Sequence, residues 1–190
     1  MQPTVNLKTM DKSGSLFAQI SKLAKLEVLV GIPESSDRRQ DLLSQAEKTK
    51  PTKSGKMSKR KKKLIAASES EVNNAQLMFI HTNGSPLKGI PKRPVIEPAI
   101  EASGNREPIA EELGEAAHAI LDSDPEAARQ HLKRAGMTGQ NASRAWFTDA
   151  RNHWQKNSEE TIRRKGSDRP LIDTGEMRKA ITYVVRDGGE

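Results

Sequence analysis

The segment 158–185 constrains the fold most, because the ends of one short helix, the start of a second helix and a strand can all be read from it. Ser158 can cap a helix by accepting a hydrogen bond from a backbone N–H group that has no partner within the helix. Gly166 can end that helix in the left-handed conformation. Asp173 and Glu176 have the spacing of a capping-box variant, which predicts that Asp173 caps the second helix.

Two runs of residues with high strand propensity predict the strands. The run 181–185 is β-branched and aromatic, and alternation along a strand places Ile181, Tyr183 and Val185 on one face. The run 26–32 is short and aliphatic, and Pro33 stops it.

Apolar spacing and composition predict helices between these strands, and Asp124 can cap one of them after a break at 122–125. We expect helices in 13–25, 64–80, 109–121, 128–136 and 141–154, a weaker one at 42–47, a turn at 83–86 and an extended stretch at 89–95. Candidates for burial in the second of these helices are Ala75, Leu77, Met78 and Phe79. A chain of 190 residues with this order predicts one α+β domain, 1–190, with a small antiparallel sheet packed against several helices.

Positive charge is concentrated in one block rather than spread over the chain. The block contains no acidic residue and nine basic ones: Lys48, Lys50, Lys53, Lys56, Lys59, Arg60, Lys61, Lys62 and Lys63. Because the formal net charge of the whole chain is +7, the remainder carries −2. We interpret 36–70 as a flexible basic insertion loop, which is either solvated or in contact with DNA or an acidic partner surface. A second cluster surrounds the predicted turn at Gly166 and consists of Arg163, Arg164, Lys165 and Arg169.

No catalytic or metal-binding motif competes with these basic clusters. The chain has no cysteine, which excludes disulfides and thiolate chemistry, and its four histidines do not have metal-ligand spacing. His118 and His131 are either a metal-binding pair that arises by chance or exposed histidines on helices, and we favour the second interpretation. Glu111, Glu112 and Glu115 are expected on a solvated helix face. Trp146 and Trp154 are either interface anchors or core residues, and we expect the core. We therefore expect no enzyme and no cofactor.

Three blocks of the sequence resemble, in order and spacing, the neck and tail-completion proteins of long-tailed bacteriophages. The first block is Val30-Gly-Ile-Pro-Glu34, and the second consists of the segments 74–86 and 90–100. The third block comprises Trp154, Thr161, Lys165, Gly166, Pro170, Leu171, Ile172, Asp173, Thr174 and Gly175. Val95 departs from the family pattern, which often has an aromatic residue there, and 36–70 has the character of an insertion.

The resemblance implies a structural virion protein that forms a homo-oligomeric ring at the head–tail junction and lets DNA pass. Its implied partners are the head connector or adaptor and the tail terminator or tail tube, and no membrane is implied. Its implied location is the virion, after assembly in the host cytoplasm. Two alternatives stay open: a tail terminator that caps the tail tube, and a basic, non-specific nucleic-acid-binding protein.

Overall fold

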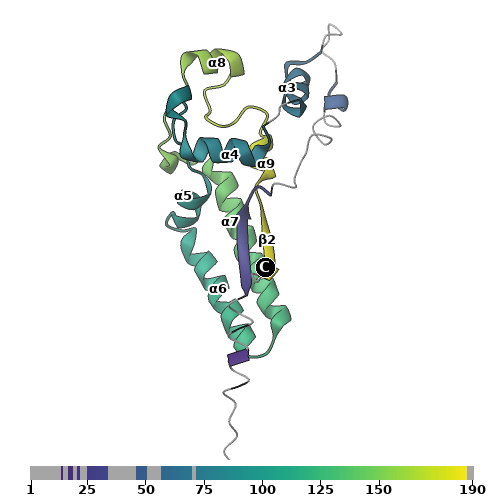
Figure 1. Cartoon of the computed structure of the whole chain (residues 1–190), viewed down its shortest axis with the longest axis vertical. Helices are drawn as coiled ribbons and strands as arrows, with labels where there is room; N and C mark the ends of the chain where they lie inside the picture. The colour runs from purple at the N-terminus through teal and green to yellow at the C-terminus, as the bar shows by residue number, and fades with distance from the viewer. Residues whose placement is uncertain are drawn as a thin grey trace, which may run out of the picture.

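A helical hairpin and a two-stranded sheet form the long body of the molecule (Figure 1). The computed structural model describes residues 14, 17–18, 21, 25–33, 46–50, 57–69 and 72–187. The hairpin consists of α6 (Arg106–Leu121) and α7 (Pro125–Trp146), and the antiparallel sheet consists of β1 (Leu26–Gly31) and β2 (Thr182–Asp187). The other elements are α3 (Lys59–Ser68), α4 (Asn74–Asn83), α5 (Ile96–Glu101), α8 (Glu159–Lys165), α9 (Glu176–Ala180) and the 3₁₀ turns Pro86–Lys88 and Ala150–Asn152. The expected α+β class, with a small antiparallel sheet on helices, is confirmed.

The sheet packs one face on α7 and leaves the other outside. Val30 pairs with Tyr183, and these inward residues meet α7. Leu29 pairs with Val184 on the opposite face, where they are 44% and 43% exposed. Ile181, directly before β2, is fully buried. The predicted alternation in 181–185 is therefore confirmed, as is the predicted strand before Pro33.

The prediction that a helix ends at Gly136 is wrong, because α7 continues through it to Trp146. A Cβ atom at Gly136 would overlap the ring of Tyr183. A Cβ atom at Gly139 would lie 3.0 Å from Cγ2 of Val30. The two glycines thus let the sheet approach α7 closely, and neither of them interrupts α7.

Three of the four predicted caps are as expected. Asp124 accepts a hydrogen bond from the Ala127 N–H at 2.9 Å, Ser158 caps α8, and Gly166 ends α8 with φ of 73°. Asp173 is not a cap, because the N-cap of α9 is Gly175, with φ of 82° and no side chain. This left-handed glycine moves the helix start beyond the reach of Asp173, whose carboxylate pairs with the Lys63 ammonium instead.

The first half of the chain differs most from the predictions. The basic block does not stay a loop to residue 63, since α3 begins at Lys59. The predicted helix 64–80 is two helices, and a capping box with Asn73 as N-cap starts the second one. Among the four residues expected to be buried there, Met78 is buried, whereas Phe79 is 70% exposed. Leu77 is exposed and Ala75 is half-buried.

Two further predictions lie largely outside the described residues. In 13–25, residues 14, 17, 18 and 21 are helical, and the apolar positions that carry the prediction, Leu16, Ile20, Leu23 and Ala24, are not described. In 42–47, Ala46 and Glu47 are helical, and the rest of that segment is not described.

The main core gathers residues from all three blocks that carry the family resemblance. Its buried members are Met78, Val95, Ala99, Trp146, Phe147, Met177 and Ile181, and Val30, Ile32, Ile96, Trp154, Leu171 and Ile172 pack against them. Trp154 meets Phe147 edge to face at 5.9 Å, and its Nε1 donates to the Pro94 carbonyl oxygen at 3.1 Å. The expected core placement of both tryptophans is confirmed.

Candidate nucleic-acid interface

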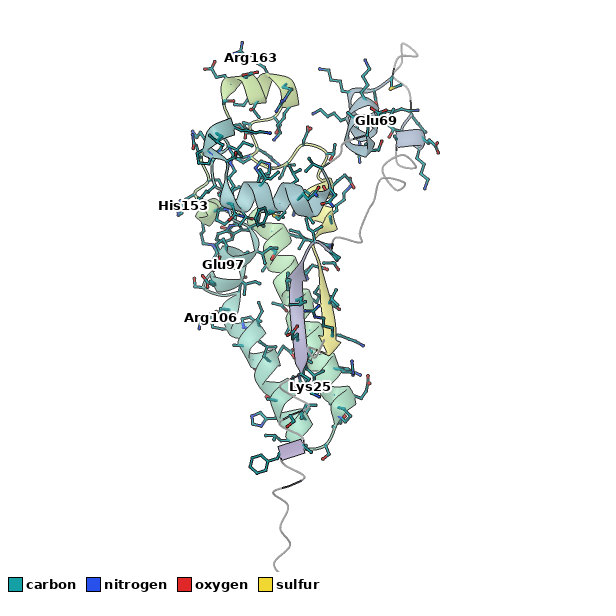
Figure 2. All side chains as sticks on the ribbon, in the orientation of Figure 1. Lys25, Glu69, Glu97, Arg106, His153 and Arg163 are labelled. Atoms are coloured by element: carbon teal, nitrogen blue, oxygen red, sulfur yellow. The ribbon has the colours of Figure 1, made fainter. Side chains whose placement is uncertain are left out.

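The structure joins the two basic clusters through one side chain. The Lys63 ammonium of α3 donates to the carbonyl oxygen of Lys165 at the end of α8, at 2.8 Å, and also pairs with Asp173. As a result α3 and the turn after α8 belong to the same end of the molecule (Figure 2). Sequence analysis identified both clusters but gave no reason to expect this contact.

The first turns of α3 carry three exposed cations. Lys59, Arg60 and Lys62 are exposed, and α3 has no acidic residue in its first turn. Cations at this position are unfavourable for the helix, because its N-terminus already carries partial positive charge. Stability of α3 therefore does not explain the cations, and the alternatives from the sequence, a solvated surface or contact with a polyanion, both stay open.

The remaining residues of the two clusters differ in their contacts. Lys48 and Lys50 are exposed, Lys61 is half-buried, and Lys53 and Lys56 lie outside the described residues. Arg163 and Arg164 are exposed, and the Arg163 guanidinium lies 3.9 Å from the Glu159 carboxylate. Arg169 is exposed at its side chain, and its carbonyl oxygen accepts from the Lys165 ammonium at 2.7 Å. The 170–175 motif shapes the turn next to them: Pro170, Leu171, Ile172, Thr174 and Gly175 are half-buried.

Behind the exposed cations lies a buried positive group. Arg93 is 6% exposed and donates to the carbonyl oxygens of Gln155 and Lys156, and no carboxylate among the described residues forms an ion pair with it. Burial lowers the pKa of Lys165, and the nearby Arg93 and Lys63 lower it further, whereas Asp173 raises it. Burial also lowers the pKa of His81, and so do Arg93 and Lys165. A bound anion would relieve this repulsion.

Sequence reasoning missed Arg93 and His81. The only signal was their position inside the second resembling block, and neither has a motif around it. Their significance depends on the proximity of residues 155–165, which are distant in the sequence. The Nδ1 atom of His81 is buried and makes no hydrogen bond within the described part of the chain.

The acidic face of α6 is not wholly solvated, which corrects one expectation. Glu112 lies 2.8 Å from Nδ1 of His131 and 2.9 Å from Nε of Arg134, and so it links α6 to α7. Burial opposes ionisation of Glu112, but the hydrogen bonds from His131 and Arg134 outweigh it and lower the pKa. Glu111 and Glu115 are exposed, as expected.

The described residues contain no group of three or more histidine or carboxylate side chains that could hold a metal ion. None of the described helices is long and apolar enough to cross a membrane. No protein-family model matches the chain, and neither a curated protein nor a solved structure matches it.

Proposed function

We propose that the protein is a structural subunit of a tailed phage, which forms a ring at the head–tail junction and lets DNA pass. The observation that carries the proposal is the order of the three blocks that resemble neck and tail-completion proteins. Their apolar residues come from distant segments and pack into one core, so the three blocks belong to one structural unit. The proposed role is binding, without catalysis.

The cations of α3 and of the turn after α8 fit a DNA-facing role in such a ring. They form a charged surface without an aromatic side chain among them, which suits phosphate contact and does not suit base stacking. Binding of this kind neutralises phosphates without reading sequence, so DNA can slide past it.

The experiment that tests the proposal is localisation of the subunit in phage particles. We expect cryo-electron microscopy of particles carrying a tagged copy to reveal a cyclic arrangement between head and tail. A single isolated copy elsewhere in the particle would contradict the ring. A ring at the end of unjoined tails would favour the tail terminator alternative.

A second candidate, a non-specific nucleic-acid-binding protein, is favoured by the same cationic end. It predicts tight DNA binding by the free protein, with a steep dependence on salt. The ring proposal predicts weak DNA binding by the monomer, because a single copy contributes few phosphate contacts. Titration of duplex DNA at two salt concentrations separates the two candidates.

A further inference from the structure

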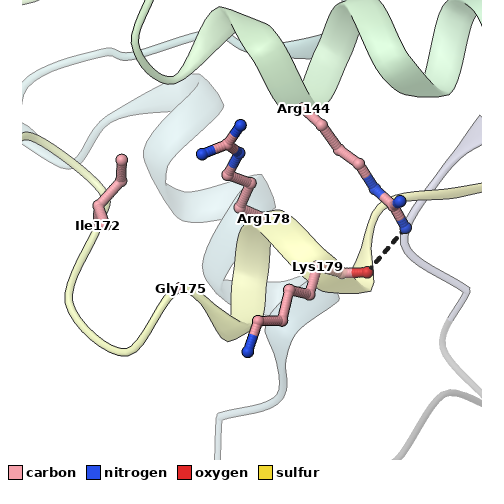
Figure 3. A pocket seen from close by; sticks show the side chains of 5 residues that line it. All are labelled: Arg144, Ile172, Gly175, Arg178 and Lys179. Carbon is pink, nitrogen blue, oxygen red and sulfur yellow. Dashed lines mark hydrogen bonds between the residues drawn. The ribbon is translucent and has the colours of Figure 1, made fainter.

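A cationic pocket lies between α7 and α9, beside Ile172 and Gly175 of the third resembling block. Its volume is about 270 Å³, and it is lined by Arg144, Ile172, Gly175, Arg178 and Lys179 (Figure 3). Arg144 is held in place, since its guanidinium donates to the carbonyl oxygen of Lys179 at 3.0 Å and to that of Ile181 at 2.6 Å. Lys179 is paired with Glu176 at 2.8 Å.

Arg178 is the unsatisfied member of this pocket. Its guanidinium extends toward α7, between Ile172 and Arg144 (Figure 3). Within the described residues it makes no hydrogen bond and no ion pair, although it is only half-exposed. Gly175 adds no side chain to the pocket wall, and a Cβ atom there would meet no neighbour within 4 Å. The pocket therefore offers a planar, bidentate donor that has no acceptor.

The chemistry of the lining favours a carboxylate as the occupant. A guanidinium binds a carboxylate through two parallel hydrogen bonds, and Ile172 supplies an apolar wall for the methylene groups of a side chain. A phosphate of duplex DNA is the other oxyanion to consider. It is held on a broad helical backbone, and the exposed lysines of α3 suit that backbone better than a recess beside an isoleucine does.

The chain itself presents suitable carboxylates on another surface. Glu107, Glu111 and Glu115 follow one another at four-residue spacing on the exposed side of α6. Glu111 and Glu115 make no ion pair with another described residue. In Figure 1, α6 and α9 lie on opposite sides of α7, so one copy can offer its α6 to the pocket of the next copy. A contact between two different surfaces is heterologous and can close into a ring.

We propose that the pocket binds a carboxylate from α6 of a second copy, Glu111 or Glu115, as part of the contact between neighbouring subunits. The inference rests on the proposed ring, for which it names a subunit contact. The Arg178 guanidinium is the main donor, and the fixed Arg144 closes the other side of the pocket.

Charge reversal with mixing tests this contact directly. We expect Arg178→Glu, and separately Glu111→Arg with Glu115→Arg, to weaken self-association at least about tenfold in analytical ultracentrifugation, as loss of a partly desolvated charge pair does. An equimolar mixture of the two variants should regain association, because each then meets an opposite charge on both surfaces. Matched controls are Lys133→Glu and Glu69→Lys, which change exposed charges elsewhere and should leave association unchanged.

Cross-linking extends the test to a weak contact. A zero-length carbodiimide reagent joins an amine to a carboxylate, and a mixture of ¹⁴N- and ¹⁵N-labelled protein identifies links between copies. We expect mass spectrometry to find Lys179 of one copy joined to Glu111 or Glu115 of another. Absence of this link, association unaffected by Arg178→Glu, or variants that stay apart when mixed would each overturn the inference.

The outcomes also separate this inference from the proposed function. If rings still assemble in the particle when Arg178→Glu is present, the proposed function is retained and this subunit contact is excluded. Folding of each variant is checked by circular dichroism, and the regain on mixing cannot come from a misfolded chain. If a DNA duplex protects Arg178 from an arginine-modifying reagent and a second copy of the protein does not, the pocket binds phosphate and the carboxylate assignment is overturned.

Discussion

Replacement of Gly136 by alanine should destabilise the protein, even though alanine is the better helix former. In the middle of a helix, Gly→Ala alone stabilises by up to about 1 kcal/mol. At Gly136, however, the new Cβ would overlap the ring of Tyr183 and lie 3.1 Å from its Cβ, which the strand backbone holds in place. Overpacking of this kind costs about 1–3 kcal/mol. Subtracting the helix gain of about 1 kcal/mol leaves an expected net loss of up to about 2 kcal/mol, or a fall in Tm of up to about 8 °C for a chain of this size.

The matched control is the same change on the other helix of the hairpin. Gly114 lies on the exposed side of α6, where a Cβ atom would meet nothing within 4 Å. Gly114→Ala should therefore stabilise by about 0.5–1 kcal/mol, opposite in sign to Gly136→Ala. Urea titration followed by circular dichroism measures both changes. Adding Tyr183→Ala to both backgrounds should remove the penalty at Gly136, because the ring is gone.

The result that would refute this reasoning is a stabilising Gly136→Ala in the presence of Tyr183. The sheet would then not approach α7 as closely as described, and the glycines of α7 would need another explanation.

Three further predictions concern the C-terminal block, the cations and pH. Asp173→Ala should change stability by less than about 1 kcal/mol, because it removes an exposed ion pair and no helix cap. Ile181→Asp should cost about 4 kcal/mol or more, because it places a charge at a fully buried position. Equal denaturation midpoints for the two variants would contradict this prediction. Replacing Lys59 and Lys62 by serine should leave Tm nearly unchanged and flatten the salt dependence of DNA binding; an unchanged slope in a binding titration would exclude both residues from phosphate contact. The pKa of His81 is lower in the folded state, so the unfolded chain binds the proton first and stability should fall as pH drops below about 6.5. His81→Gln should weaken that loss, as measured by urea midpoints at pH 7 and pH 5, and an identical loss in both proteins would assign the acid sensitivity to other groups.

The features that the sequence predicted correctly are those decided within a few residues. Ser158 and Asp124 cap helices because the donors they meet are three residues away. The alternation in 181–185 likewise follows from strand geometry alone. The same local logic failed at Asp173, because the left-handed Gly175 lies between it and the helix and displaces the first helical turn.

The features that could not be predicted depend on neighbours distant in the sequence. Gly136 has the local appearance of a helix end, and only the ring of Tyr183 reveals its role in packing. Arg93 became part of the candidate site through burial against 155–156, and the pocket at Arg178 needs both α7 and α9. The residue types alone identified the exposed cations, whereas the buried Arg93 behind them could be identified only from the fold.

Pairing between β1 and β2 has a consequence for the order of folding. β2 follows every other described element in the chain, and the helices α3 to α9 lie between β1 and β2 in the sequence. The α6–α7 hairpin can form from neighbouring segments as soon as both have been synthesised, but β1 must wait for β2 and for the buried Ile181 before it. A ribosome that stops before residue 181 would therefore release a chain with a formed hairpin, an unpaired strand and an open core. Such a chain would be exposed to proteases.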